Sequence, residues 1–228
     1  MSTMTMKEAM KEAMKERHTV RKYTDKAIPQ EIIKLLNERI AVNNEKYKLA
    51  IKLNINDTSA FNAIIKLIMA KGVKNYFVLA GPDTPDLDWK LGYCGADLML
   101  YAQTLGLNTW WVGGTFNKSR VSAASGENRV IGIIAAGYGT NQGKPHKSKK
   151  FEEVVSYNGE IPAWFQAGVE AALLAPTAMN KQAFMLRGDN NEVDLIYDSG
   201  IFKGVDMGII KYHFELGAGV ENFHWKND

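Results

Sequence analysis

The chain has 228 residues, of which 46% are apolar, 23% charged and 10% aromatic, and these proportions are those of an ordinary globular protein. They exclude a collagen, a coiled coil or an intrinsically disordered chain as a description of the whole molecule. The 28 Lys and Arg residues exceed the 25 Asp and Glu residues only slightly, which excludes the dense basic footprint of a dedicated nucleic-acid binder. The length fits one large domain or two small ones.

The few cysteines and histidines indicate neither disulfides nor a metal site. Cys94 is the single cysteine, so it cannot form an intramolecular disulfide or a cysteine-based zinc site. The four histidines show no metal-ligand spacing, and we expect no metal. The N-terminus lacks the apolar core of a signal peptide, and no stretch approaches the roughly 18 apolar residues of a membrane helix. We therefore expect a cytoplasmic protein that binds neither membrane nor nucleic acid.

The N-terminal quarter predicts two amphipathic helices and a strand. In the first helix, from Met4 to Arg17, the unit Met-Lys-Glu-Ala recurs. We expect its methionine face to pack on the body of the chain; a helix on a membrane surface is the alternative, which the mixed Glu and Lys of its polar face disfavour. Pro29 fits the first position of a second helix that reaches about Arg39. Apolar and polar residues then alternate from Tyr47 to Ile55, the period of a half-buried strand.

The middle of the chain predicts buried strands around one glycine-rich helix. Strands are expected at 76–80, 109–112 and 129–138, with glycine at or just after the end of each. Between the first two strands, a helix that ends at Leu105 carries small residues on one face, which permits close helix packing, and Gly106 is expected to cap it.

The C-terminal third adds a second set of helices and strands. The expected elements are a helix at 162–174, a polar interruption at 175–182, a hairpin of strands 184–187 and 193–197, a helix at 205–216 and a strand at 222–225. The helix and strand at 205–225 echo those at 97–111, either as a shortened copy or by coincidence between common patterns. The whole chain is therefore expected to be an α+β protein.

Two basic segments are candidate phosphate ligands. Arg17, Thr19 and Arg21 place two guanidinium groups and a hydroxyl close together, and charged donors of this kind fork onto phosphate oxygens. Lys147 and Lys149 alternate on a loop, so in an extended conformation both would point the same way. Each cluster alone is more typical of a solvated surface.

A third polar segment offers neutral groups. Thr177, Asn180 and Gln182 could hydrogen-bond to the carbonyl and imide edges of a heterocycle, and Pro176 stiffens their loop, although alone it is an ordinary helix-end loop. The sequence has no Gly-x-Ser-x-Gly nucleophile motif, and the glycine-rich segment 137–144 lacks the Ser or Thr of a P-loop. The sequence therefore favours binding of a phosphorylated heterocycle over hydrolytic chemistry.

Taken together, these segments resemble the FMN-dependent nitroreductase family. The Arg-x-Ser-x-Arg-x-Phe-like opening motif of that family is similar to Arg17–Tyr23, and its Ala-Pro-Ser-x-x-Asn-x-Gln-Pro motif is similar to Ala175–Ala183. Its helix ending in Leu-Gly-Leu resembles Asp97–Leu107, and the glycine-containing segment that follows resembles Val112–Thr115. Its basic pair ahead of Leu-Glu-Glu-Val is similar to Lys147–Lys149.

The resemblance implies a nitroreductase-like α+β fold, with a central, mostly antiparallel sheet flanked by helices, and an FMN cofactor. It implies that electrons pass from NAD(P)H through the flavin to a small organic acceptor, either a nitroaromatic or a quinone-like compound, so the protein need supply no catalytic side chain. The FMN-binding residues that it implies are Arg17, His18, Thr19, Arg21, Val112, Gly113, Gly114, Lys147, Lys149, Pro176, Thr177, Ala178, Asn180 and Gln182.

Two further expectations concern charge and aromatic packing at this site. Arg21 is expected to stabilise the negative charge that develops at N1 and O2 of reduced flavin. Trp110 and Trp111 could line the ring pocket, but packing in the core is the favoured interpretation for each.

The order of the motifs departs from that of the family, because the Ala-Pro-Thr segment follows the basic pair. In ordinary homodimeric members the partner subunit donates this segment. We therefore predict a single-chain pseudo-dimer with one flavin, as in a subgroup of nitroreductase-like proteins that the sequence resembles. Residues 1–158 form a nearly complete half, and residues 159–228 form a shortened copy that donates the segment within one shared core. A monomer is favoured, and a homodimer stays open.

The rearranged order also leaves two other functions open. A flavin-binding module that stores or senses its ligand without turnover is the main alternative, because a rearranged scaffold can keep binding and lose its substrate cleft. A colourless interaction protein without flavin is the third.

Overall fold

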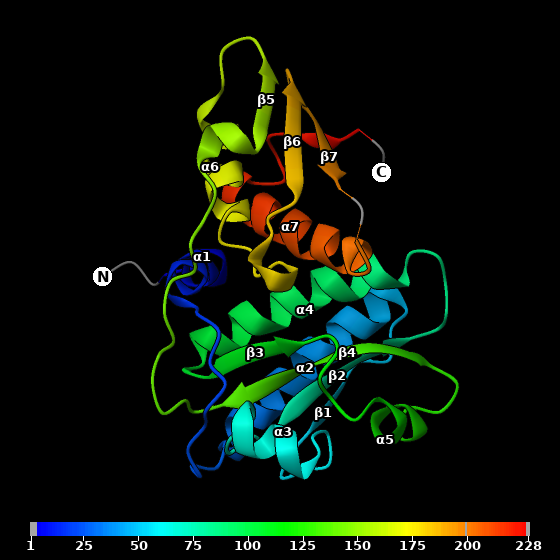
Figure 1. Ribbon diagram of the computed structural model, residues 1–228. Helices are drawn as coiled ribbons and strands as arrows, with labels where there is room; N and C mark the ends of the chain where they lie inside the picture. Colours follow the sequence, from blue (N-terminus) through cyan, green and yellow to red (C-terminus); the bar gives the residue numbers. More distant parts are fainter. Residues whose placement is uncertain (1–3, 199, 227–228) are drawn as a thin grey trace.

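Two long helices, α4 (Leu87–Thr104) and α7 (Lys203–Ala218), pack together at the centre of the fold, which the computed structural model describes for residues 4–198 and 200–226 (Figure 1). Glycines permit this contact. A Cβ atom at Gly92 would lie 2.1 Å from the carbonyl oxygen of Val205, and one at Gly208 would lie 2.0 Å from that of Trp89. The two backbones can therefore approach to a distance that any larger residue would prevent.

A four-stranded antiparallel sheet lies on the α4 side of this pair (Figure 1). Its strands, in the spatial order β1-β2-β4-β3, are β1 (Lys52–Asn54), β2 (Tyr76–Gly81), β4 (Arg129–Gly137) and β3 (Asn108–Val112). Alternate side chains of β2 enter different cores, since Phe77 packs in the cluster that includes α4 and Val78 packs with Phe61 on the other face.

Four further helices pack around α4 and the first sheet. Helix α2 (Gln30–Tyr47) packs on α4, and α1 (Met6–Glu16) packs on both α4 and α7 with Met10 and Met14 buried. The prediction that the methionine face of the first helix packs on its own chain is therefore confirmed. The short helices α3 (Ala63–Ile68) and α5 (Lys118–Ala123) were not predicted from the sequence.

A second four-stranded sheet lies on the α7 side and is mixed. Its strands, in the order β5-β6-β7-β8, are β5 (Val155–Asn158), β6 (Phe184–Asp189), β7 (Glu192–Tyr197) and β8 (His224–Trp225). The outer pairs are parallel and the β6-β7 hairpin is antiparallel. Helix α6 (Ala163–Ala172) packs on α7, and Phe165 of α6 and Phe214 of α7 pack in the same core cluster as the sheet.

The predicted α+β class is confirmed, and the antiparallel sheet is the first of two. The strand expected from Tyr47 to Ile55 was wrong in its first half, because α2 continues to Tyr47 and only Lys52–Asn54 pairs with β2. Asn44 explains the boundary, since its side chain bonds both the amide and the carbonyl of Ile51 at 2.9 Å and so holds the turn. None of the helices described is long and apolar enough to span a membrane.

Candidate functional site

A cavity of about 1180 Å³ is lined by residues from both sides of the predicted 158/159 boundary. The first half contributes Arg17, His18, Thr19, Arg21, Lys22, Trp110, Trp111, Gly113, Gly114, Asn141, Gly143, Lys144 and His146. The second half contributes Pro176, Thr177, Ala178, Met179, Asn180, Phe202, Val205, Asp206 and Ile209. Ligand pockets commonly measure about 300–1,000 Å³, so this cavity is large enough for a cofactor-sized molecule.

The opening motif runs along one wall as an extended strip. Arg17 ends α1 with extended backbone, and isolated bridges then pair Thr19 with Thr109 of β3 and Tyr23 with Gly139. The Val20 amide also donates to the Thr109 carbonyl at 3.1 Å. Sheet pairing therefore fixes the position of this strip, and this position determines where its charged side chains lie.

Arg17 is a buried cation with an unsatisfied donor. Its side chain lines the cavity while the residue is only 5% exposed, and its Nη1 atom is buried with no hydrogen-bond partner. Burial lowers the pKa of the Arg17 guanidinium from 12.5 to about 10, so the group stays charged at neutral pH. A buried charge without a partner is costly, and an anion at Nη1 would remove that cost.

Arg21 lies against an aromatic stack at the same wall. Its guanidinium carbon is 5.4 Å from the centre of the Trp110 ring, and Trp110 stacks on Phe61 at 5.7 Å. A guanidinium is attracted to the face of an indole, so the stack orients this cation. Trp110 and Trp111 combine both roles considered from the sequence, because they pack against the core and also line the cavity.

A basic loop closes the wall beside the opening motif. Gly143 has a φ of +75°, and a Cβ atom there would lie 2.8 Å from Cβ of His18 and 2.9 Å from the Thr19 carbonyl oxygen. This close contact requires glycine, and it brings Lys144 and His146 to the cavity. The sequence predicted a basic loop here, but it did not indicate these two residues as lining groups.

The side chains of Lys147 and Lys149 do not lie where they were predicted to bind phosphate. Neither is among the residues that line the cavity. Instead, the Lys147 carbonyl accepts a hydrogen bond from the Asn180 side chain at 2.8 Å, and the Lys149 amide donates to Gln182 Oε1 at 2.6 Å. The backbone of the pair therefore supports the Ala-Pro-Thr segment.

The Ala-Pro-Thr segment, which belongs to residues 159–228, lines the cavity opposite the opening motif. Thr177, Ala178 and Asn180 line the cavity, whereas Gln182 is buried behind it. The side-chain amide of Gln182 donates to the Leu173 carbonyl at 2.8 Å, and its backbone amide donates to Thr177 Oγ1 at 3.1 Å. Gln182 thus holds the wall from behind.

Asp206 is a buried carboxyl group in the lining, and it was not among the site residues predicted from the sequence. Its two oxygens each lie 3.0 Å from the Ala178 amide nitrogen, and Oδ2 also accepts a hydrogen bond from the Tyr197 hydroxyl. Loss of solvent raises the pKa of the Asp206 carboxyl, although both hydrogen bonds lower it in part. In sequence, its only signal was a place near the start of the last helix.

Most of the predicted FMN-binding residues thus meet at one cavity. Those that line it are Arg17, His18, Thr19, Arg21, Gly113, Gly114, Pro176, Thr177, Ala178 and Asn180. Those that do not are Val112, Lys147, Lys149 and Gln182. Across the described ranges, 4–198 and 200–226, no three His, Cys, Asp or Glu side chains are placed to hold a metal ion.

The fold is that of the nitroreductases. It matches the crystal structure of a protein described as a "putative nitroreductase" from Thermotoga maritima with a TM-score of 0.66 and 21% identity, over 91% of this chain and 82% of that one. It matches a nitroreductase-like protein from Streptococcus mutans with a TM-score of 0.53 and 13% identity, over 62% of this chain and 94% of that one. A protein from Exiguobacterium sibiricum in complex with FMN matches with a TM-score of 0.52 and 14% identity, over 63% and 94%.

The family is established by sequence. A family model described as "Putative TM nitroreductase" matches residues 9–218, and the chain belongs to this family. The chain is thereby classed as an oxidoreductase. No curated protein matches it.

Proposed function

We propose that the protein is an FMN-dependent oxidoreductase that passes electrons from NAD(P)H to a small organic acceptor, either a nitroaromatic or a quinone-like compound. The observation that carries this proposal is the charged Arg17 side chain, buried at the cavity with Nη1 unsatisfied. A phosphate would supply the missing acceptor, and the FMN complex of the Exiguobacterium relative supports FMN as its source.

The residues of the cavity fit FMN in charge and in hydrogen-bonding capacity. Arg17 and Lys144 carry the charge that a phosphate needs, while Thr177 and Asn180 offer neutral donors and acceptors for a heterocycle. When bound, FMN would supply the hydride and electron-transfer chemistry through its ring. We propose that the other predicted residues act from behind the wall, as the hydrogen bonds of Gln182 and Lys149 indicate.

The remaining lining residues set the environment of the reaction. Trp110, Trp111 and Phe202 provide aromatic surface that excludes water from the cavity. Arg21, held on the face of Trp110, supplies positive charge that would stabilise negative charge developing on a reduced ring. We infer that these side chains bind and orient, and that none acts as a nucleophile.

We also propose that the single chain replaces the usual dimer. The cavity takes its walls from both sides of the 158/159 boundary, which supports a nearly complete half at 1–158 and a shortened half at 159–228. The Streptococcus and Exiguobacterium proteins are covered almost in full, yet they correspond to only 62% and 63% of this chain. These values support the proposal that the rest of this chain takes the place of a partner subunit. On this basis we propose a cytoplasmic monomer.

The absorbance spectrum of the purified protein, supplied with FMN, tests the proposal. A protein that retains FMN and is bleached by NADH or NADPH without oxygen is the expected result. A yellow protein that neither nicotinamide reduces would instead favour a storage or sensing module. A protein that binds no FMN would contradict the proposed function altogether.

A further inference from the structure

His146 contacts the end of a helix with one of its two ring nitrogens. Helix α6 ends at Ala172, and the carbonyl oxygen of the next residue, Leu173, lies 2.9 Å from His146 Nε2. A carbonyl oxygen can only accept, so Nε2 carries a proton and donates it to Leu173. The Ser148 hydroxyl and the Gln182 side-chain amide donate to the same oxygen at 3.2 and 2.8 Å. Because the C-terminal end of a helix carries partial negative charge, this contact favours a positively charged His146 ring.

The other ring nitrogen, Nδ1, is available to a ligand. His146 lines the cavity, and within the described part of the chain its Nδ1 atom has no hydrogen-bond partner. With the first proton on Nε2, a neutral ring can only accept a hydrogen bond at Nδ1, whereas an imidazolium donates one there. The oxygens of a phosphate dianion only accept. His146 can therefore hydrogen-bond to phosphate at Nδ1 only when the ring takes up a second proton.

His146 lies at the same end of the cavity as the unsatisfied Arg17. Both side chains line the cavity, and both act on His213, a buried residue one turn after Ile209 on α7. Burial lowers the pKa of His213 to about 3, and the charges of Arg17 and His146 contribute to this shift. His213 donates from Nδ1 to the Ile209 carbonyl at 2.8 Å and stays neutral at pH 7. Arg17 and His146 are thus the charged or chargeable groups that an anion would meet at this end.

The surroundings of His146 are cationic. The titratable or charged groups near it are Arg17 at the end of α1, His18 on the extended strip, His213 on α7, and Lys144 and Lys147 on its own loop. Among the described residues no carboxylate lies within ion-pair distance of His146, and Asp206 of the lining is occupied by the Ala178 amide and the Tyr197 hydroxyl. These cations oppose a charge on His146, whereas a phosphate at Arg17 would favour it.

We propose that His146 is a ligand of the FMN phosphate in its imidazolium form, and that the protein takes up a proton at His146 Nδ1 when FMN binds. This inference rests on the proposed function, in which the phosphate lies at Arg17. The proton comes from solvent, Nε2 keeps its hydrogen bond to the Leu173 carbonyl, and Nδ1 donates to the phosphate. His146 then contributes to the distinction between FMN and riboflavin, which has no phosphate.

The test measures proton uptake as the apo-protein binds FMN at pH 7.5. Isothermal titration calorimetry in buffers of different ionisation enthalpy gives the number of protons bound per FMN. The second pKa of a phosphomonoester is about 6, so FMN is already a dianion, and any further titration of its own would release protons. An ordinary histidine is about one-tenth protonated at this pH, and a charge-assisted hydrogen bond strengthens its proton binding about tenfold. We therefore expect uptake of about 0.4 proton per FMN.

Three comparisons assign this proton to His146. His146→Gln keeps a donor for the Leu173 carbonyl but cannot become charged, so FMN binding should take up less than about 0.1 proton. His224→Gln is the matched control and should keep the wild-type uptake, because His224 is exposed on β8 beside Glu192 and outside the cavity lining. Riboflavin should bind wild type without proton uptake. The affinity for FMN should fall about fivefold from pH 6.5 to 8.5 in wild type and stay level in His146→Gln.

Nitrogen NMR of the ring gives a direct measurement on the unaltered protein. In the FMN complex at pH 7.5, both ring nitrogens of His146 should shift toward the imidazolium position, and the spectrum of His146→Gln identifies their signals. Equal uptake in His146→Gln and wild type, equal uptake with riboflavin and FMN, or neutral-ring signals in the complex would each overturn the inference while FMN binding leaves the proposed function standing. A protein that binds no FMN overturns both.

Discussion

Arg17 is a buried cation whose charge has a different cost with and without a bound anion. Its guanidinium is buried with Nη1 unsatisfied, so without a ligand it is a cost to the fold. We expect Arg17→Gln to weaken FMN binding by about 2 kcal/mol, roughly thirtyfold, since a hydrogen-bonded charge pair is lost. Quenching of FMN fluorescence during titration measures this affinity.

In the apo-protein, Arg17→Gln should raise the melting temperature or leave it unchanged. Removing an unpaired buried charge does not lower the melting temperature of apo-protein through lost contacts, whereas loss of a paired residue would. Arg187→Gln, at an exposed position on β6, is the control and should leave the FMN affinity unchanged. An Arg17→Gln protein with wild-type affinity would contradict the phosphate role of Arg17.

Asp206 makes stability depend on pH with a defined sign. Its pKa in the folded state is raised above the ordinary value of 3.8, so the folded protein binds this proton more tightly than the unfolded chain. Its contribution to stability is therefore full below pH 3.8 and is lost as the pH rises through the folded value. We expect Asp206→Asn to lose less stability than wild type between pH 3.5 and about pH 7, as measured by urea unfolding.

Two substitutions qualify this expectation. Asp198→Asn, at an exposed position beside Tyr197, should keep the wild-type pH profile. Asp206→Ala also removes the acceptor for the Ala178 amide, so amide hydrogen exchange at Ala178 should accelerate in Asp206→Ala more than in Asp206→Asn. Equal pH profiles in Asp206→Asn and wild type would show that the carboxyl does not titrate in this way.

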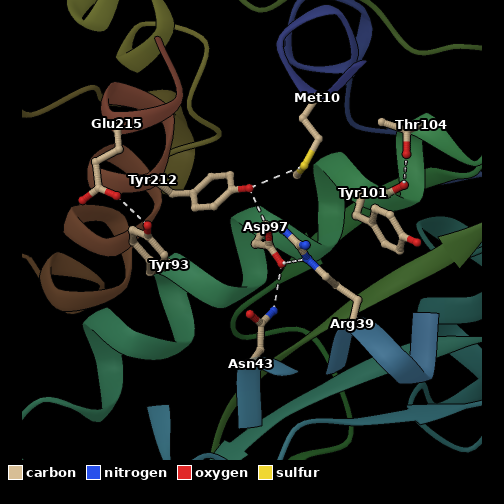
Figure 2. A network of polar contacts seen from close by, with 9 residues as sticks. All are labelled: Met10, Arg39, Asn43, Tyr93, Asp97, Tyr101, Thr104, Tyr212 and Glu215. Carbon is tan, nitrogen blue, oxygen red and sulfur yellow. Dashed lines mark hydrogen bonds and ion pairs between the residues drawn. The ribbon is translucent and has the colours of Figure 1, made fainter. Parts of the chain in front are cut away.

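At the scale of elements, one polar network ties together four helices, of which α7 also lines the cavity. Asp97 of α4 accepts hydrogen bonds from Arg39 at 2.8 and 2.5 Å, from Asn43 at 2.8 Å and from Tyr212 of α7 at 2.6 Å (Figure 2). Figure 2 also shows Met10 of α1 directed at Tyr212, whose hydroxyl donates a hydrogen bond to the Met10 sulfur at 3.8 Å. The network therefore links α1, α2, α4 and α7 through one carboxylate.

Removal of that carboxylate should destabilise the whole fold. Asp97 is 2% exposed, and Asp97→Ala leaves Arg39, Asn43 and Tyr212 without their shared acceptor, so we expect a loss of about 3 kcal/mol of unfolding free energy. Glu38→Gln, which breaks the exposed Lys34–Glu38 pair on α2, should cost less than about 0.5 kcal/mol. Urea unfolding measures both, and a small loss in Asp97→Ala would contradict the linking role.

Local sequence signals predicted the elements that local forces determine. The β6-β7 hairpin follows its turn residues, and Gly106, with a φ of +78°, comes two residues after the end of α4 at Thr104. Lys147 and Lys149 were predicted as phosphate ligands from their charge and alternation and from their similarity to the basic pair of the family. That alternation does not specify direction, because the contact between Gly143 and His18 decides which part of the loop reaches the cavity. Tertiary contacts placed Lys144 there instead.

Asp206 could not be assigned to the site from sequence for a similar reason. Its role comes from Ala178 and Tyr197, which are 28 and 9 residues away along the chain. The opening motif and the Ala-Pro-Thr segment were predictable because each carries its polar groups within a few consecutive residues. Their meeting at one cavity depends on how α4 and α7 pack, and the small residues that permit this contact do not specify the partner helix.

At the scale of the molecule, the proposed pseudo-dimer predicts one FMN per chain. The basic strip at Arg17–Lys22 is present once, and the second half has no Arg-x-Thr-x-Arg equivalent at which another phosphate could bind. A second cavity among the described residues measures only about 490 Å³, less than half of the first. Titration of the apo-protein with FMN should therefore reach its endpoint at one equivalent, and sedimentation should give the mass of a single 25.4 kDa chain. A ratio near two, or a dimer that dissociates with loss of flavin, would mean that the cavity within one chain is not the complete site.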